Sequence, residues 1–135
     1  MKAFVPFHQH LLVRGTMRNP IIDPLKLNLW FKSLVELVDM EILMAPWSIY
    51  VNDLGNEGIT GIVCLSTSHS SLHVWDKLEE PLFQFDLYSC KQYDVDIVIS
   101  WLNEMDLIEY DWMLIDRNST LSLQKTGTNG TALSH

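Results

Sequence analysis

Residues 58–75 read Gly-Ile-Thr-Gly-Ile-Val-Cys-Leu-Ser-Thr-Ser-His-Ser-Ser-Leu-His-Val-Trp and carry the strongest fold signal in the chain. Residues 59–65 form an apolar run with the length of a buried strand, and residues 72–75 resume as a second strand. A small polar break over residues 66–71 separates the two runs. A strand that follows a strand directly is typical of antiparallel pairing, because parallel neighbours need a longer crossover.

Further strand signals lie on both sides of this stretch. Residues 83–88 alternate between apolar and polar side chains, the period of a half-buried strand. Residues 3–13 are apolar and aromatic, and Leu11-Leu12-Val13 is their strongest strand signal. The remaining strand-like segments cover residues 42–44, 47–51 and roughly 107–115.

The spacing of apolar residues predicts two amphipathic helices. Asp23-Pro24 indicates the start of the first helix, because an acceptor side chain suits the N-cap and proline suits the first helical position. The second helix is expected to start near Asp94. The predicted buried faces are Leu27, Trp30, Phe31, Leu34, Val35 and Val38 in the first helix, and Ile97, Val98, Trp101, Leu102 and Met105 in the second.

The resulting order, β-α-β-β-β-β-α-β, favours an α+β fold. We expect a two-layer sandwich, in which a largely antiparallel sheet carries the helices on one face, rather than a doubly wound parallel sheet. The length of 135 residues fits one domain. We place that domain at residues 1–117 and expect residues 118–135, which are polar and lack periodicity, to form a disordered tail.

Charge and composition exclude several classes of protein. Nine basic and 17 acidic residues give a net charge of −8, which argues against a large basic face for nucleic acid or an anionic membrane. The chain has no apolar stretch near the length of a membrane helix. We expect no secretory signal, because His8, Gln9 and His10 interrupt any apolar run near residue 1. Its two cysteines, Cys64 and Cys90, lack metal-type spacing, as expected of a cytoplasmic protein with reduced thiols. We expect no metal site from His69, His73 and Cys90, because these positions span too far along a strand.

Two spaced motifs carry the functional signal: Ser68-His69-x3-His73 and Asp86-x3-Cys90. Together with the glycines before them, they resemble the pattern of the small prokaryotic S-adenosylmethionine decarboxylases, which are pyruvoyl enzymes made as proenzymes. The similarity covers about residues 8–116, including an opening His10-Leu11-Leu12-Val13. The matching positions are Gly58, Thr60, Gly61, Ser68, His69, Leu72, His73, Trp75, Asp86, Tyr88, Ser89 and Cys90.

This resemblance implies a carboxy-lyase that makes its own cofactor by autocatalytic cleavage of a zymogen. The Ser68 hydroxyl would attack the carbonyl of Thr67, and the chain would split between residues 67 and 68, leaving a pyruvoyl group at residue 68. That group would form a Schiff base with the substrate amine and accept electrons as carbon dioxide leaves. By the same resemblance Cys90 is the catalytic proton donor. His73 and Thr60 would serve the self-processing step.

Two departures from the family pattern bear on cleavage and substrate. Thr67 replaces the usual glutamate before the serine, although its backbone still supplies the carbonyl. Trp75-Asp76-Lys77 replaces Trp-Pro-Glu, so the acid expected to hold the ribose hydroxyls is missing. Trp75 matches an aromatic position near the family's substrate site. Glu79, Glu80 or Asp76 would have to compensate, and we expect Trp75 and Glu79 to bind substrate.

Three functions follow as hypotheses. The first is decarboxylation of S-adenosylmethionine in polyamine (spermidine) biosynthesis by a cytoplasmic homodimer of processed protomers, with no nucleic-acid or membrane partner. The second is the same pyruvoyl machinery acting on ornithine or arginine. The third is an unprocessed binding or regulatory homologue. Taken alone, Ser68 fits an ordinary turn serine and Cys90 a small buried hydrophobe.

Overall fold

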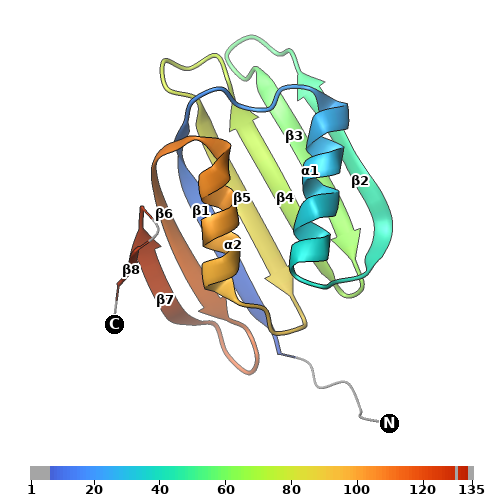
Figure 1. The fold of residues 1–135 in the computed structure, drawn as a ribbon, viewed down its shortest axis with the longest axis vertical. Coiled ribbons are helices and arrows are strands. Elements are labelled where there is room, and N and C mark those ends of the chain that lie inside the picture. Colours follow the sequence, from blue (N-terminus) through green and yellow to red (C-terminus); the bar gives the residue numbers. More distant parts are fainter. Residues whose placement is uncertain (1–6, 130, 134–135) are drawn as a thin grey trace.

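The computed structural model describes residues 7–129 and 131–133, and it shows one antiparallel sheet with two helices on one of its faces (Figure 1). The helices are α1 (Pro24–Leu37) and α2 (Val95–Leu102), and a short 3-10 turn, η1 (Asn103–Met105), follows α2. The strands are β1 (Gln9–Met17), β2 (Ile42–Val51), β3 (Gly58–Leu65), β4 (Ser68–Trp75), β5 (Leu82–Ser89), β6 (Leu107–Asp116), β7 (Ser122–Thr128) and β8 (Thr131–Leu133).

The sheet has eight strands in the order β2-β3-β4-β5-β1-β6-β7-β8. The sequence-adjacent strands β2 to β5 form one half, and β1 inserts between β5 and β6. This arrangement confirms the predicted α+β two-layer sandwich. Within the described ranges, no helix combines the length and the apolar character needed to cross a membrane.

Both helices begin where the sequence predicted. The Asp23 side chain accepts a hydrogen bond from the Leu25 amide at 2.9 Å, and Asp94 accepts one from the Asp96 amide at 3.0 Å. The predicted face of α1 is confirmed, with Trp30 only partly buried. The predicted face of α2 is partly wrong, because Ile97 is exposed. The helix instead buries the i, i+3, i+4, i+7 set Val95, Val98, Ile99 and Leu102.

Three strand predictions need correction. The segments at 42–44 and 47–51 form a single strand, β2, whose pairing with β3 shifts register twice. β4 begins at Ser68, within the predicted polar break. His69 and Ser71 lie on the open face, which requires no apolar side chains, and the buried Ser70 donates its hydroxyl to the Asp86 carbonyl at 2.6 Å. The first strand runs over Gln9–Met17, later than predicted, and residues 1–6 lie outside the described ranges.

The prediction of a disordered tail over residues 118–135 is wrong for Ser122–Thr128. This segment forms β7, which pairs with β6 from Asp111↔Thr128 to Asp116↔Ser122. Its side chains are mostly exposed, so backbone hydrogen bonds rather than apolar burial hold it against β6. A strand of that kind has no hydrophobic pattern for sequence reasoning to detect. Residues 130, 134 and 135 lie outside the described ranges.

The sheet has one covered face and one open face. Alternate residues of β1 show the division: Leu11 and Val13 are buried under the helices, whereas Leu12 and Arg14 are exposed. The core between sheet and helices includes Phe31 of α1 and Val98 of α2. The open face carries polar and titratable side chains among its apolar ones.

Gly61 lets α1 lie close to the sheet. A Cβ at this position would meet Leu27 Cδ2, Phe31 Cε2 and Ser48 Oγ, each at 2.7 Å. Real Cβ contacts are longer, so a side chain at residue 61 would push the helix outward. The second glycine of the family-like motif therefore has a packing role in β3.

Candidate active site

The bond between residues 67 and 68 lies at a tight hairpin between β3 and β4. Leu65 pairs with Ser68, so Ser66 and Thr67 alone make the turn. Thr67 is exposed and has a φ of 56°, in the left-handed region. A β-branched residue rarely adopts this conformation, and such backbone strain costs about 1–3 kcal/mol. The residue before Ser68 is thus held in a strained conformation.

The hairpin brings Ser68 to Cys90, which follows the last residue of β5. Ser68 Oγ accepts a hydrogen bond from the Cys90 amide at 3.0 Å. Ser68 Oγ also lies 3.5 Å from Cys90 Sγ. The thiol is buried, with 7% of the residue exposed. The two residues expected to supply the electrophile and the proton are therefore neighbours, although 22 positions separate them in sequence.

Thr67 completes this group through its side chain. Its Oγ1 donates to the Ser66 carbonyl at 2.7 Å and lies 2.6 Å from Cys90 Sγ. In the contact between Thr67 and Cys90, either the hydroxyl or the thiol can be the donor. A residue that departs from the family pattern therefore contacts the candidate proton donor directly.

A pocket of about 410 Å³ opens beside these three residues. Its wall is completed by the segment between α1 and β2 and by Lys91, whose Nζ donates to the Asp39 carbonyl at 2.6 Å. A volume of this size falls within the range of about 300–1,000 Å³ that is usual for small-molecule sites. The pocket residues are Asp39, Met40, Glu41, Ser66, Thr67, Ser68, Cys90 and Lys91. Sequence reasoning missed Asp39, Glu41 and Lys91, because no motif links the end of α1 to the hairpin.

His73 and Thr60 form a separate pair. They face each other on β4 and β3, and Thr60 Oγ1 lies 3.0 Å from His73 Nδ1. His73 comes five residues after Ser68 along β4, which places it about 16 Å away at 3.3 Å per residue. One chain therefore does not bring His73 and Thr60 to its own Ser68. His73 instead borders a second hollow of about 580 Å³ on the open face, lined in part by Arg14 and Gln84.

The predicted substrate-binding residues lie at the far end of β4. The Trp75 indole donates to Asn56 Oδ1 at 2.9 Å, and Glu79 lies exposed in the loop before β5. Asp76 accepts a hydrogen bond from the Tyr50 hydroxyl at 2.8 Å, with only 7% of its side chain exposed. The structure does not bring Trp75, Asp76 or Glu79 to Ser68 within one chain.

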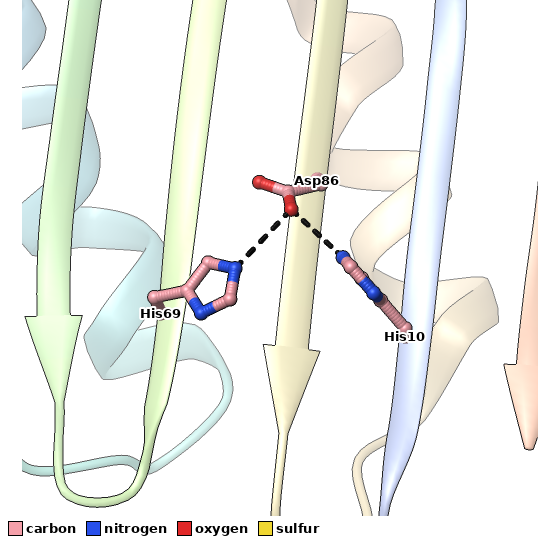
Figure 2. A group of neighbouring side chains, drawn as sticks. All are labelled: His10, His69 and Asp86. Atoms are coloured by element: carbon pink, nitrogen blue, oxygen red, sulfur yellow. Dashed lines mark hydrogen bonds and ion pairs between the residues drawn. The ribbon is translucent and has the colours of Figure 1, made fainter. Parts of the chain in front are cut away.

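A cluster on the open face joins β1, β4 and β5, and Figure 2 shows that its two imidazoles converge on one carboxylate. Asp86 Oδ2 lies 2.7 Å from His10 Nε2 and 3.4 Å from His69 Nε2. The other oxygen, Oδ1, accepts the Ser71 amide at 3.0 Å and the Ser71 hydroxyl at 2.6 Å. In the part of the chain that the structure describes, this trio is the one group of metal-ligating residues close enough to share an ion. His69, His73 and Cys90 do not meet.

The environment of Asp86 favours its charged form. Burial raises the pKa of this carboxyl, but hydrogen bonds from His10 and Ser71 and the nearby charges of the two histidines outweigh that effect. The pKa of Asp86 therefore lies below its ordinary value. Sequence reasoning had matched Asp86 and His69 to the family pattern without giving them a role. The convergence of His10 on them follows from β1 pairing with β5, which the sequence does not reveal.

Comparison with known proteins identifies the family to which this site belongs. Among curated proteins, none matches the chain. The sequence profile of the S-adenosylmethionine decarboxylase family, however, matches residues 11–110, most of the sheet and both helices. That match spans the hairpin, Ser68, Cys90 and two members of the polar cluster, His69 and Asp86, whereas His10 lies one residue before it. The members of this family are decarboxylases, that is, carboxy-lyases. The chain belongs to the S-adenosylmethionine decarboxylase family.

Proposed function

We propose that the chain is a pyruvoyl-dependent decarboxylase of S-adenosylmethionine that cleaves itself between Thr67 and Ser68. The observation that supports this most is the contact of Ser68 with Cys90 at a strained two-residue turn. An ordinary turn serine needs neither a buried thiol beside it nor a left-handed threonine before it. A pocket opens at the same place, so the product of cleavage would face substrate directly.

Cleavage would begin with an attack by Ser68 Oγ on the Thr67 carbonyl carbon, which converts the amide into an ester. Elimination then breaks the Ser68 Cβ–Oγ bond, so residues 1–67 leave with a carboxylate. Hydrolysis of residue 68 releases ammonia and leaves a ketone at its α-carbon. Strain of about 1–3 kcal/mol at Thr67 would help, because the ester no longer holds that residue in the turn.

The pyruvoyl group supplies an electron sink for the loss of carbon dioxide. The residues present fit such a group, since residue 68 opens on the pocket and the Cys90 thiol lies beside it. The chain's own contribution is then proton transfer. Cys90 Sγ, 3.5 Å from Ser68 Oγ, is placed to return a proton to the α-carbon of the substrate.

We propose a homodimer because His73 and Thr60 cannot reach Ser68 in the same chain. In a two-fold dimer, each partner presents the same surface to the other, so His73 of one copy can serve Ser68 of the second. The open face has apolar residues to support such a contact, among them Leu12, Ile62 and Met113. Trp75 and Glu79 would bind substrate at the partner's pocket by the same reasoning.

Complementation between two inactive variants tests this sharing of residues. Ser68→Ala and His73→Ala should each remain uncut when expressed alone. When they are co-expressed with different tags, the His73→Ala chain should be cut, because the Ser68→Ala chain supplies the missing histidine. Failure of cleavage in purified mixed dimers would contradict the proposed sharing of His73.

The substrate is inferred from charge and pocket chemistry. Asp39 and Glu41 line the pocket together with Lys91, whose Nζ lies 3.3 Å from Asp39 Oδ2. The two acids outnumber this one base, and the chain carries a net charge of −8, which suits a cationic ligand such as the sulfonium of S-adenosylmethionine. The same acids would also suit the distal cation of ornithine or arginine. Loss of the ribose-binding acid, where Lys77 stands, favours this second candidate. Release of carbon dioxide from each labelled compound, measured in parallel, separates the two.

We place the enzyme in the cytoplasm and in polyamine (spermidine) biosynthesis, as the family resemblance implies. A third candidate, an unprocessed regulatory homologue, rests on Thr67 in place of glutamate. An intact chain after purification, with no carbon dioxide released from any substrate, would favour that candidate.

A further inference from the structure

The polar cluster in Figure 2 lies directly beside the proposed cleavage site. His69 follows Ser68 in the chain, and its imidazole reaches across to Asp86 on β5, 3.4 Å away. His10 on β1 reaches the same oxygen from the other side, at 2.7 Å. The second residue after the cleavage site, His69, is thereby connected through Asp86 to the two strands that follow β4 across the sheet.

Asp86 is itself firmly held, so it can act as an anchor. Ser71 donates both its amide and its hydroxyl to Oδ1, while the histidines occupy Oδ2. Only 18% of the Asp86 side chain is exposed. Tyr88 packs against both imidazoles, with ring centroids 5.6 Å from His10 and 5.7 Å from His69. The His69 side chain, which is 41% exposed, therefore contacts Asp86 and Tyr88.

Cleavage would change what holds residue 68. In the intact chain the turn through Ser66 and Thr67 ties Ser68 to β3. After cleavage residue 68 is a chain end, and chain ends fray unless they are tied down. His69↔Tyr88 is also the last pair between β4 and β5 at that end. The His69–Asp86 contact is thus the nearest side-chain tether left to the new terminus.

We propose that His10, His69 and Asp86 are positioning residues that hold residue 68 against Cys90 after the chain is cut. This inference rests on the proposed function. It gives the His69 of the family-like motif a role distinct from that of His73. Cys90 lies only four residues beyond Asp86 along the same segment, so one anchor fixes both partners of the proton transfer.

A divalent metal ion fits the trio less well. The Arg117 guanidinium lies 3.2 Å from His10 Nδ1 and can only donate there. When His10 is neutral, this contact leaves the imidazole proton on Nε2. That proton points at Asp86, where a metal ion would need a free nitrogen lone pair. The fixed charge of Arg117, 4.1 Å above the Tyr88 ring, would also repel a cation.

The test uses His69→Ala and Asp86→Asn in the processed protein, with Glu36→Gln as the matched control. Glu36 is an exposed carboxyl on α1, away from the cluster. Intact mass is measured first, and both variants should be cut as the wild type is. Hydrogen exchange without substrate should then be about tenfold faster for the amides at the start of β4 in His69→Ala, with no change in Glu36→Gln.

Turnover gives a second readout. If the proton goes to residue 68 instead of the substrate, hydrolysis leaves alanine at residue 68 and releases an aldehyde together with carbon dioxide. The variants should lose about ten- to a hundredfold in kcat. In the variants, a larger share of turnovers should also convert residue 68 into alanine. Mass spectrometry of the 68–135 chain detects this conversion. A merely destabilised protein would lose activity without changing that share.

The outcomes separate the two proposals. An uncut wild-type chain would overturn the proposed function. A wild type that is cut, with both variants matching its exchange rates and its share of alanine, would overturn the positioning role alone. Faster exchange together with more alanine in both variants would support it. Zinc titration by calorimetry adds an independent check, because stoichiometric binding that His69→Ala abolishes would assign the trio to a metal instead.

Discussion

A single methyl group added at Gly61 is expected to loosen the packing of α1 on the sheet. The new Cβ would sit 2.7 Å from Leu27 Cδ2 and 2.7 Å from Phe31 Cε2. Both side chains are fully buried, so neither can move into solvent. Each contact must lengthen to ordinary van der Waals distance, and only a shift of α1 can provide that space.

The cost follows from overpacking in a filled core, which is about 1–3 kcal/mol. For a domain of this size, each kcal/mol lowers the melting temperature by about 2–8 °C. Gly61→Ala should therefore unfold at a clearly lower urea concentration than the wild type, with an unchanged slope. Intrinsic tryptophan fluorescence can follow the transition, since Trp30 packs 5.0 Å from Phe31 between ring centroids.

A second substitution tests whether the cost of Gly61→Ala comes from its clash with Leu27. Leu27→Ala alone should cost about 2–5 kcal/mol, because it leaves a cavity in the core. That cavity would accept the Gly61→Ala methyl, so the double variant should cost less than the sum of the two. Equal unfolding midpoints for Gly61→Ala and wild type, or costs that add to within about 0.5 kcal/mol, would contradict the close approach of α1.

Three further predictions concern the site and the helix start. Cys90→Ala should leave the chain cut but lower decarboxylation by about 10²–10⁴-fold in single-turnover assays, the usual contribution of a general acid; an unchanged rate would exclude Cys90 as the proton donor. Because the folded-state pKa of Asp86 is lowered, its stabilisation is present above about pH 4 and is lost as pH falls through the folded pKa. The gap in urea stability between wild type and Asp86→Asn should therefore be widest near neutral pH and shrink below pH 4; a gap that does not depend on pH would refute this. Asp23→Ala should cost about 1 kcal/mol, because the Leu25 amide loses its acceptor; no change in the urea midpoint would count against the cap.

The elements that sequence reasoning predicted well are those with a periodic apolar face or a capping residue. α1 is an example, since Asp23-Pro24 and the apolar stripe give both its start and its buried side. Sequence reasoning missed β7 because an exposed strand needs no apolar alternation. It missed the first half of β4 because a serine, Ser70, fills the buried position there and hydrogen-bonds the Asp86 carbonyl. The segments predicted at 42–44 and 47–51 belong to one strand, β2. Its irregular pairing with β3 makes a continuous strand difficult to recognise from the sequence.

The candidate site was predictable only in part. Residue types and spacing led to Ser68 and Cys90, and the structure brings those two together. Spacing could not show that His73 lies along the strand from Ser68, because sequence distance says nothing about which residues of a hairpin meet. Asp39 and Glu41 come from a connection far away in sequence, and His10 joins Asp86 only because β1 pairs with β5.

The intact mass of freshly purified protein under denaturing conditions tests the proposed self-processing most directly. Two chains that separate between Thr67 and Ser68, the second bearing a ketone in place of its serine amine, are the predicted result. The Ser68→Ala variant should give one chain of the full 15.6 kDa. A single uncut wild-type chain of that mass would contradict the proposal that this protein makes its own pyruvoyl group.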